Sequence, residues 1–219
     1  MKRIIFIGIA CACLAAPALA DLYGGSLSGS GITGTGAWAT NAEITWKVTQ
    51  NTDGTWHYNY VFSAPAKEFS HFIFEISNDF PISGDFLNLS TQGLEDPKIG
   101  WWSAGDGQSN PGMPAPMFGV KFDTMDEWDF TFWTIDFDIT RSPMWGNVYA
   151  KDGKMPGGTP EVYLYNTDFL KVGEILDRYA LESPGAFIAV PNHFVPVPGA
   201  VLLGFLGLGY AGMRLRREV

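Results

Sequence analysis

The chain has 219 residues, of which 46% are hydrophobic and only 17% charged, with a formal net charge of −9. This acidic balance excludes a nucleic-acid-binding protein, which needs a basic surface to contact phosphates. Both cysteines, Cys11 and Cys13, lie in an apolar stretch near the N-terminus, so the body of the chain has no disulfide and must be stabilised by its core.

The N-terminus has the pattern of a secretory signal peptide. A basic start precedes an apolar run over residues 4–14, and Ala18 and Ala20 form a small-x-small cleavage site. We expect residues 1–20 to be removed after Ala20. The protein is therefore predicted to be exported, with residues 21–194 as one secreted domain.

Alternating hydrophobicity in the body predicts β-strands. Residues 24–37 are interpreted as a flexible lead-in or a weak edge strand. Apolar and polar residues alternate over residues 43–49 and 56–62, and the turn residues 51–54 join them, which predicts a hairpin. A third strand is expected over residues 70–76.

Further short strands are expected along the rest of the body. They cover residues 86–90, 98–103, 117–122, 129–140, 145–150, 162–165 and 186–190. Residues 104–116 are rich in Gly and Pro and predict a loop, and residues 169–181 have a weak helical pattern. This pattern predicts an all-β fold, an antiparallel β-sandwich that is jelly-roll-like.

The aromatic phase changes near Phe132 within the strand expected over residues 129–140. One extra residue at that point would produce the change, so we predict a β-bulge there. A strand that is buried on both faces is the competing interpretation.

Two acidic patterns are candidate sites. Asp136 and Asp138 lie two apart on a strand and therefore on one face, a spacing that would suit a pair of glycosidase carboxylates. A solvated acidic face explains them better. Asp123, Asp126 and Asp129 offer several hard oxygens in a short stretch, which makes them the candidate ligands for calcium. We expect no other cofactor and no catalytic residues.

Two neighbouring tryptophans are the candidate glycan contacts. Trp101 and Trp102 lie beside loop 104–116, and their rings are expected on opposite faces of a strand. An exposed tryptophan can stack on the apolar face of a sugar ring. We favour the interpretation in which the loop covers both rings, with a carbohydrate-binding role as the alternative.

The C-terminus has the pattern of a membrane segment. Val195, Pro196 and Pro198 are followed by the uncharged residues 199–213, and the chain then closes with a basic cluster. The basic residues are Arg214, Arg216 and Arg217. A helix over residues 195–213 would extend about 28 Å, close to the ~30 Å of a hydrocarbon core. We expect a single C-terminal transmembrane helix with its arginines on the cytoplasmic side.

This Val-Pro-x-Pro start, the Gly/Leu-rich apolar run and the terminal arginines together resemble the PEP-CTERM sorting signal over residues 195–219. Val197 stands where the usual signal has Glu, as in its variant forms. The resemblance implies an exosortase-type processing enzyme as partner and a Gram-negative source. It also implies transient residence in the inner membrane and a final place at the cell surface or in the matrix.

From these patterns we expect an exported, non-catalytic surface or extracellular-matrix protein with a structural or adhesive role, associated with exopolysaccharide or biofilm. A carbohydrate-binding module or a glycosidase delivered by the same route is the alternative. The sorting segment is expected either to be cleaved or to stay as an anchor.

Overall fold

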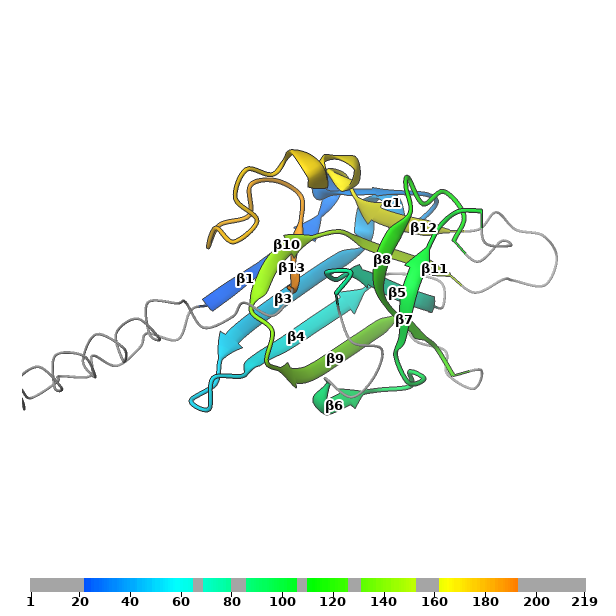
Figure 1. Ribbon diagram of the computed structural model, residues 1–219. Coiled ribbons are helices and arrows are strands. Elements are labelled where there is room, and N and C mark those ends of the chain that lie inside the picture. The colour runs from blue at the N-terminus through cyan, green and yellow to red at the C-terminus, as the bar shows by residue number, and fades with distance from the viewer. Residues whose placement is uncertain are drawn as a thin grey trace, which may run out of the picture.

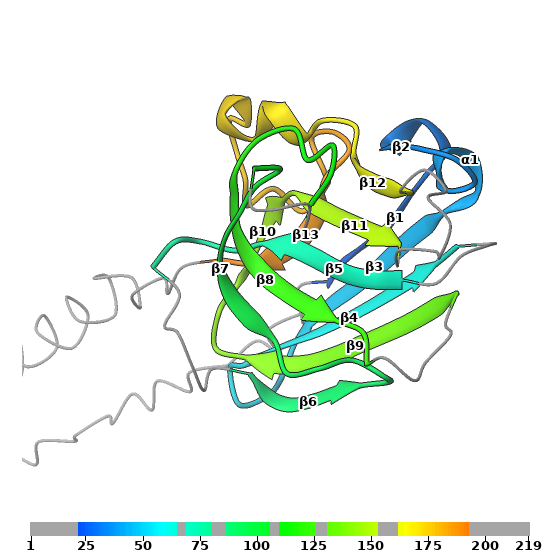
Figure 2. The same ribbon diagram turned by 90° about the vertical axis from the view of Figure 1, so that its right-hand side faces the viewer.

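Most of the described chain is antiparallel β-strand, arranged in two main sheets (Figures 1 and 2). The computed structural model describes residues 22–64, 69–79, 86–105, 110–125, 131–152 and 162–192. Within these ranges the helical elements are short, namely η1 (Gly29–Gly31), α1 (Trp38–Asn41) and η2 (Phe169–Glu174). The prediction of an all-β fold built from antiparallel sheets is confirmed.

Sheet A has five strands. Their spatial order is β1 (Leu22–Ser28), β3 (Glu43–Gln50), β4 (Trp56–Ser63), β9 (Phe132–Ile139) and β6 (Leu87–Thr91). The predicted hairpin is the β3–β4 pair, in register from Glu43↔Ser63 to Gln50↔Trp56. Gly54 in its turn has φ +88°, a left-handed conformation that glycine adopts without strain.

Sheet B has six strands. Their spatial order is β2 (Ile32–Gly34), β12 (Tyr163–Asn166), β11 (Val148–Asp152), β5 (Phe69–Glu75), β8 (Met117–Asp123) and β7 (Lys98–Trp102). The chain passes from sheet A to sheet B after β1, after β4 and after β6, and it returns to sheet A at β3, β6 and β9. This exchange brings residues that are distant in sequence together in the interior.

The interior between the sheets is largely aromatic. Tyr60 of β4 stacks against Phe74 of β5 with ring centroids 5.2 Å apart, and Phe137 of β9 lies 6.1 Å from Phe74. Tyr58 stacks on Phe137 at 5.2 Å. Aromatic side chains bury large areas, so this core supplies the cohesion that a body without cysteine cannot obtain from disulfides.

A two-stranded sheet lies beside one end of this interior. It pairs β10 (Pro143–Gly146) with β13 (Ile188–Pro191). The Tyr60 hydroxyl donates a hydrogen bond to the carbonyl of Ala189 at 2.7 Å, which fixes β13 against sheet A. All four residues of each strand are buried.

Four details differ from the expectations. The β4–β9 register is continuous from Phe132 to Ile139, so no bulge occurs in that span, and residues 126–130 lie outside the described ranges. Phe132 is 49% exposed, so β9 is not buried on both faces either. The single strand expected over 145–150 is divided at Asn147 into β10 and β11. The weak helical pattern over 169–181 yields only the six-residue η2.

The lead-in of residues 24–37 is structured. It contains most of β1 and all of β2, which lie at the edges of sheets A and B respectively, so the edge-strand interpretation is confirmed. The short helix α1 that follows was not expected, and its Trp38 is fully buried against Phe62 and Phe69. A buried tryptophan therefore fastens the N-terminal segment to the sandwich.

Candidate functional site

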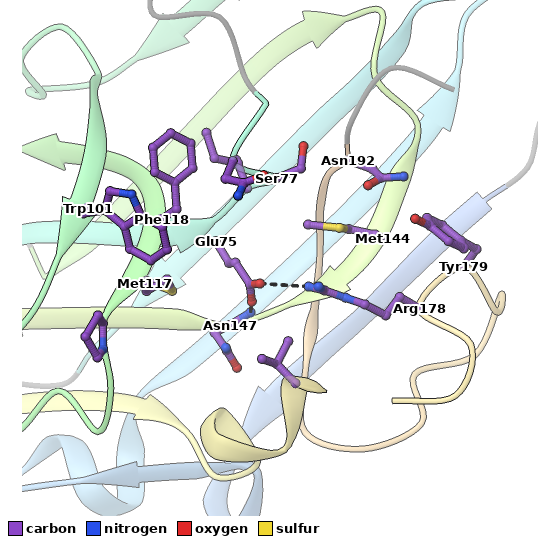
Figure 3. A pocket seen from close by; sticks show the side chains of 14 residues that line it. Glu75, Ser77, Trp101, Met117, Phe118, Met144, Asn147, Arg178, Tyr179 and Asn192 are labelled. Carbon is purple, nitrogen blue, oxygen red and sulfur yellow. Dashed lines mark hydrogen bonds and ion pairs between the residues drawn. The ribbon is translucent and has the colours of Figure 1, made fainter. Parts of the chain in front are cut away.

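A cleft of about 350 Å³ opens at one end of sheet B, where β5 and β7 end and β8 begins (Figure 3). Trp101 and Phe118 belong to one wall, and Arg178 and Tyr179 belong to the other. Glu75 and Asn147 lie between them in the view of Figure 3. The cleft combines exposed aromatic rings with several polar side chains, which is the usual composition of a small-ligand site.

Trp101 is the most exposed aromatic side chain of this wall. It is 63% exposed, and Phe118 contacts it edge-on with centroids 5.6 Å apart and an interplanar angle of 61°. Trp102 lies on the opposite face of β7, where its Nε1 donates to the carbonyl of Gly119 at 3.0 Å and the Nζ of Lys121 lies 5.2 Å from its ring. The expectation that one loop covers both rings is therefore wrong for Trp101.

The charged groups that line the cleft are paired with each other. Arg178 Nη2 donates to Glu75 Oε1 at 2.9 Å, and the backbone N–H of Asn147 donates to Glu75 Oε2 at 2.9 Å. The Glu75 side chain is 14% exposed and the Arg178 side chain 26% exposed. Such a half-buried, hydrogen-bonded pair presents little net charge to a ligand.

The wall that carries Tyr179 is held by hydrogen bonds although it contains no regular secondary structure. Arg178 Nε donates to the carbonyl of Trp145, and the N–H of Trp145 donates to the carbonyl of Arg178, at 2.9 and 2.8 Å. The indole of Trp145 also donates to the carbonyl of Ala180 at 2.7 Å. Tyr179 itself is 48% exposed, so the backbone is fixed while this side chain faces solvent.

The pair Asp136 and Asp138 lies on the outer face of sheet A, outside the cleft. Both carboxylates face the ring of His57, with Nδ1 2.9 Å from Asp138 Oδ1 and Nε2 3.6 Å from Asp136 Oδ1. Asn59 donates to Asp136 at 2.7 Å. The imidazole occupies the space in which a sugar and an attacking water would have to lie. The geometry favours the solvated-face interpretation.

The candidate calcium ligands are only partly within the described ranges. Asp123 ends β8 and accepts from Lys121 at 2.7 Å and from Lys98 at 2.8 Å, so two lysines already neutralise it. Burial disfavours its charged form, but these two hydrogen bonds outweigh that cost and hold the pKa of Asp123 below its usual value. Asp126 and Asp129 lie outside the described residues, among which no cluster of three metal-ligating side chains occurs.

A buried polar cluster that no sequence pattern indicated lies on the outer face of sheet B. His71 is 2% exposed, and its Nε2 donates to Asn110 Oδ1 at 2.9 Å. Asn110 in turn donates to the carbonyl of Ser103 at 3.1 Å. Burial, with help from the charges of Lys121 and Lys151, lowers the pKa of His71 to about 3. The ring is therefore neutral at physiological pH and acts as a structural donor.

The terminal sequence features fall outside the described residues. These are the cleavage site Ala18 and Ala20, the sorting residues Val195, Pro196 and Pro198, and the arginines 214, 216 and 217. In the part of the chain that is described, none of the helices has the length and apolar character needed to cross a bilayer. Comparison with protein-family models, with curated proteins and with solved structures finds no match to this chain.

Sequence reasoning identified Trp101 but missed the rest of the cleft. Glu75 and Arg178 are 103 positions apart and meet only because the loop after η2 folds back over the end of β5. Tyr179 falls within the weak helical pattern of residues 169–181, and nothing in that pattern indicates that its side chain is exposed. The site therefore comes from the topology more than from any local motif.

Proposed function

We propose that this protein is exported and sorted to the cell surface or extracellular matrix of a Gram-negative bacterium, where it has a non-catalytic structural or adhesive role. The observation that carries this proposal is the C-terminal Val-Pro-x-Pro start with its apolar run and terminal arginines. It is paired with a basic, apolar and Ala-x-Ala N-terminus. An exosortase-type enzyme is the processing partner, and exopolysaccharide or biofilm matrix is the proposed environment.

The body of the protein suits this role. It is an antiparallel β-structure without cysteine, in which an aromatic core provides cohesion that does not depend on the redox state of the compartment. The chain's exchange between the two sheets supports the jelly-roll-like interpretation of the sandwich. The described body runs to Asn192, three residues before the proposed sorting segment, so the domain would lie close to the surface that holds it.

The mass of the native protein tests the proposal. Removal of residues 1–20 and of the segment after the Pro196–Pro198 region would give a mature chain that lacks both ends. Retention of residues 195–219 in an exported, membrane-bound chain would indicate a permanent anchor instead. Native protein found in the cytosol with both ends intact would contradict export and sorting together.

Carbohydrate binding is the second candidate function, and the 63% exposure of Trp101 at the cleft favours it. A glycosidase is less well supported, because the ring of His57 lies between the two carboxylates that would have to act. Hydrolysis of a polysaccharide that is lost in Asp136→Asn would restore the enzymatic alternative. Binding without hydrolysis, lost in Trp101→Ala, would support the module.

A further inference from the structure

We propose that the cleft between Trp101 and Tyr179 binds a neutral saccharide, with the ring of Trp101 as its stacking platform. This inference names the ligand class of the second candidate function and rests on it. The cleft volume of about 350 Å³ lies within the range of small-molecule sites, at its small end. It therefore suits a short stretch of glycan, such as a chain end or a branch.

The aromatic groups supply the apolar part of the recognition. A pyranose presents a face of C–H groups that packs against an aromatic ring, while its edge presents hydroxyls. Trp101 is held from the side by Phe118, and with 63% of its surface exposed it has apolar area to offer a ligand. Tyr179 on the opposite wall is 48% exposed and adds a second aromatic surface with a hydroxyl.

The polar groups of the cleft supply partners for hydroxyls. Ser77 and Asn78 are among the lining residues, and each carries both donor and acceptor capacity in its side chain. Sugar hydroxyls also donate and accept, so such groups match them without any charge. The arrangement of a few polar groups around an apolar platform fixes the orientation of a ligand.

The charge of the cleft decides between neutral and acidic glycans. Among its described lining residues, Glu75 and Arg178 are the charged pair, and they neutralise each other at 2.9 Å. A uronic acid or a sulfated sugar would need a cation that is not already committed to a carboxylate. The chain also carries a net charge of −9, which repels polyanions at longer range. Both observations favour a neutral saccharide.

The wall beside Tyr179 is held in place by hydrogen bonds within the protein. The Arg178 side chain donates to the backbone carbonyl of Trp145, and the backbone N–H of Trp145 donates to the carbonyl of Arg178. The Trp145 indole donates to the carbonyl of Ala180, and the three bonds together fix this wall. A preformed wall avoids part of the ordering cost of binding. Arg178 is therefore a positioning residue, because it holds the wall and need not contact the sugar.

Affinity electrophoresis tests the proposal. Full-length protein, kept in a detergent without a sugar headgroup, is run through gels containing a neutral galactomannan, dextran or mixed-linkage β-glucan, or the acidic chains alginate and polygalacturonate. We expect retardation by at least one neutral polysaccharide. Trp101→Ala should weaken it about tenfold or more, as for truncation of a central aromatic contact, and Tyr179→Ala should weaken it less.

Phe132→Ala is the matched control, because Phe132 is 49% exposed, aromatic and on the outer face of sheet A, outside the cleft. It should leave the retardation unchanged. Trp101→Tyr keeps a platform and should retain part of the binding. The urea-unfolding midpoint of each variant shows that it is folded, and Tyr179→Ala gives an independent reading if Trp101→Ala is unstable.

The outcomes separate this inference from the function on which it rests. Binding to the acidic chains alone, lost in Trp101→Ala, would overturn the neutral-ligand assignment and leave a carbohydrate-binding role intact. Retardation by no polysaccharide, or retardation that survives Trp101→Ala and Tyr179→Ala, would overturn the proposed site. The proposal of export and sorting depends on the mass of the native chain and is untouched by either result.

Discussion

The outer faces of the two sheets differ in what covers them. On sheet A, outward residues of β4 and β9 form cross-strand polar pairs, such as His57 with Asp138 and Asn59 with Asp136, that remain partly exposed. On sheet B, the outward residues His71 and Ile73 of β5 are 2% and 0% exposed. The outer face of sheet A is therefore solvated, whereas the outer face of sheet B is buried under other segments of the chain.

The cover of sheet B comes from the residues that precede β8 and from η2. Met113, from the segment before β8, and Phe169 of η2 pack against residues of sheet B in a second apolar cluster. The residues of the sheet are Ile73, Met117 and Tyr149. Gly112 has φ +69° and lies so close to the ring of Tyr163 that a β-carbon there would overlap it. Residues 110–116, which are rich in Pro, therefore serve as a third layer over sheet B.

Removal of apolar volume from the covered outer face of sheet B should have the largest effect on stability. Ile73→Ala should lower the free energy of unfolding by about 2–5 kcal/mol, since the side chain is fully buried and a cavity would remain. Thr134→Ala, at a half-buried outward position of β9, should change it by less than about 0.5 kcal/mol. Urea-unfolding curves measure both. Equal effects would mean that sheet B is not covered.

The pH dependence of stability tests the polar part of the same cover. The folded-state pKa of His71 is lowered to about 3 from an ordinary value of 6.5, chiefly by burial and then by Lys121 and Lys151, while Asp123 opposes the shift. The unfolded chain therefore binds a proton between these values and the folded chain does not. Stability is complete above pH 6.5 and is lost as the pH falls towards 3.

Between pH 7.5 and pH 5.5, which lie one unit above and one unit below the ordinary pKa of 6.5, the free energy of unfolding should fall by about 1.4 kcal/mol. Comparison of urea-unfolding midpoints across that range isolates this fall, because His71→Gln keeps a polar side chain at the position without its titration. In the variant, the free energy of unfolding should fall between pH 7.5 and 5.5 by about 1.4 kcal/mol less than in the wild-type protein. An equal fall in both proteins would show that His71 is already accessible to protons in the folded protein.

The sequence predicted sheet A better than sheet B for a physical reason. Alternation reports one buried and one wet face, and β4 follows it throughout, with Trp56, Tyr58, Tyr60 and Phe62 all inward. In β5 the outward His71 looks like a solvated residue, but coverage by a distant loop reverses its environment. No local period records which face a loop will cover.

The cleft was predictable only at Trp101. Strand alternation placed Trp101 and Trp102 on opposite faces of β7, which the structure confirms, but the identity of the exposed ring depends on where the loop and the neighbouring strands end. The rest of the cleft depends on the contact between Glu75 and Arg178, across 103 positions of sequence. Contacts between residues so far apart in sequence arise because the chain passes between the two sheets. They leave no regular residue spacing in the sequence from which they could be predicted.

A substitution on the solvated outer face of sheet A should change stability less than the substitutions on sheet B. Asp138 accepts hydrogen bonds from Asn88 at 2.7 Å, from His57 at 2.9 Å and from Asn51 at 3.2 Å. Burial opposes its ionisation, yet these donors outweigh it and hold the pKa of Asp138 below its usual value. Its contribution to stability is therefore present above the ordinary carboxyl pKa and is lost as the pH falls through the lowered one.

Asp138→Ala should cost about 1 kcal/mol or less at neutral pH, because the released partners lie near solvent and can bind water instead. Unfolding in urea at pH 7.5 measures the cost, and Asp138→Asn, which keeps one carbonyl acceptor, should recover part of it. A loss as large as that of Ile73→Ala would contradict a solvated network on sheet A. It would mean that His57, Asn51 and Asn88 form a closed polar cluster, in which a donor left without its carboxylate has no water to replace it.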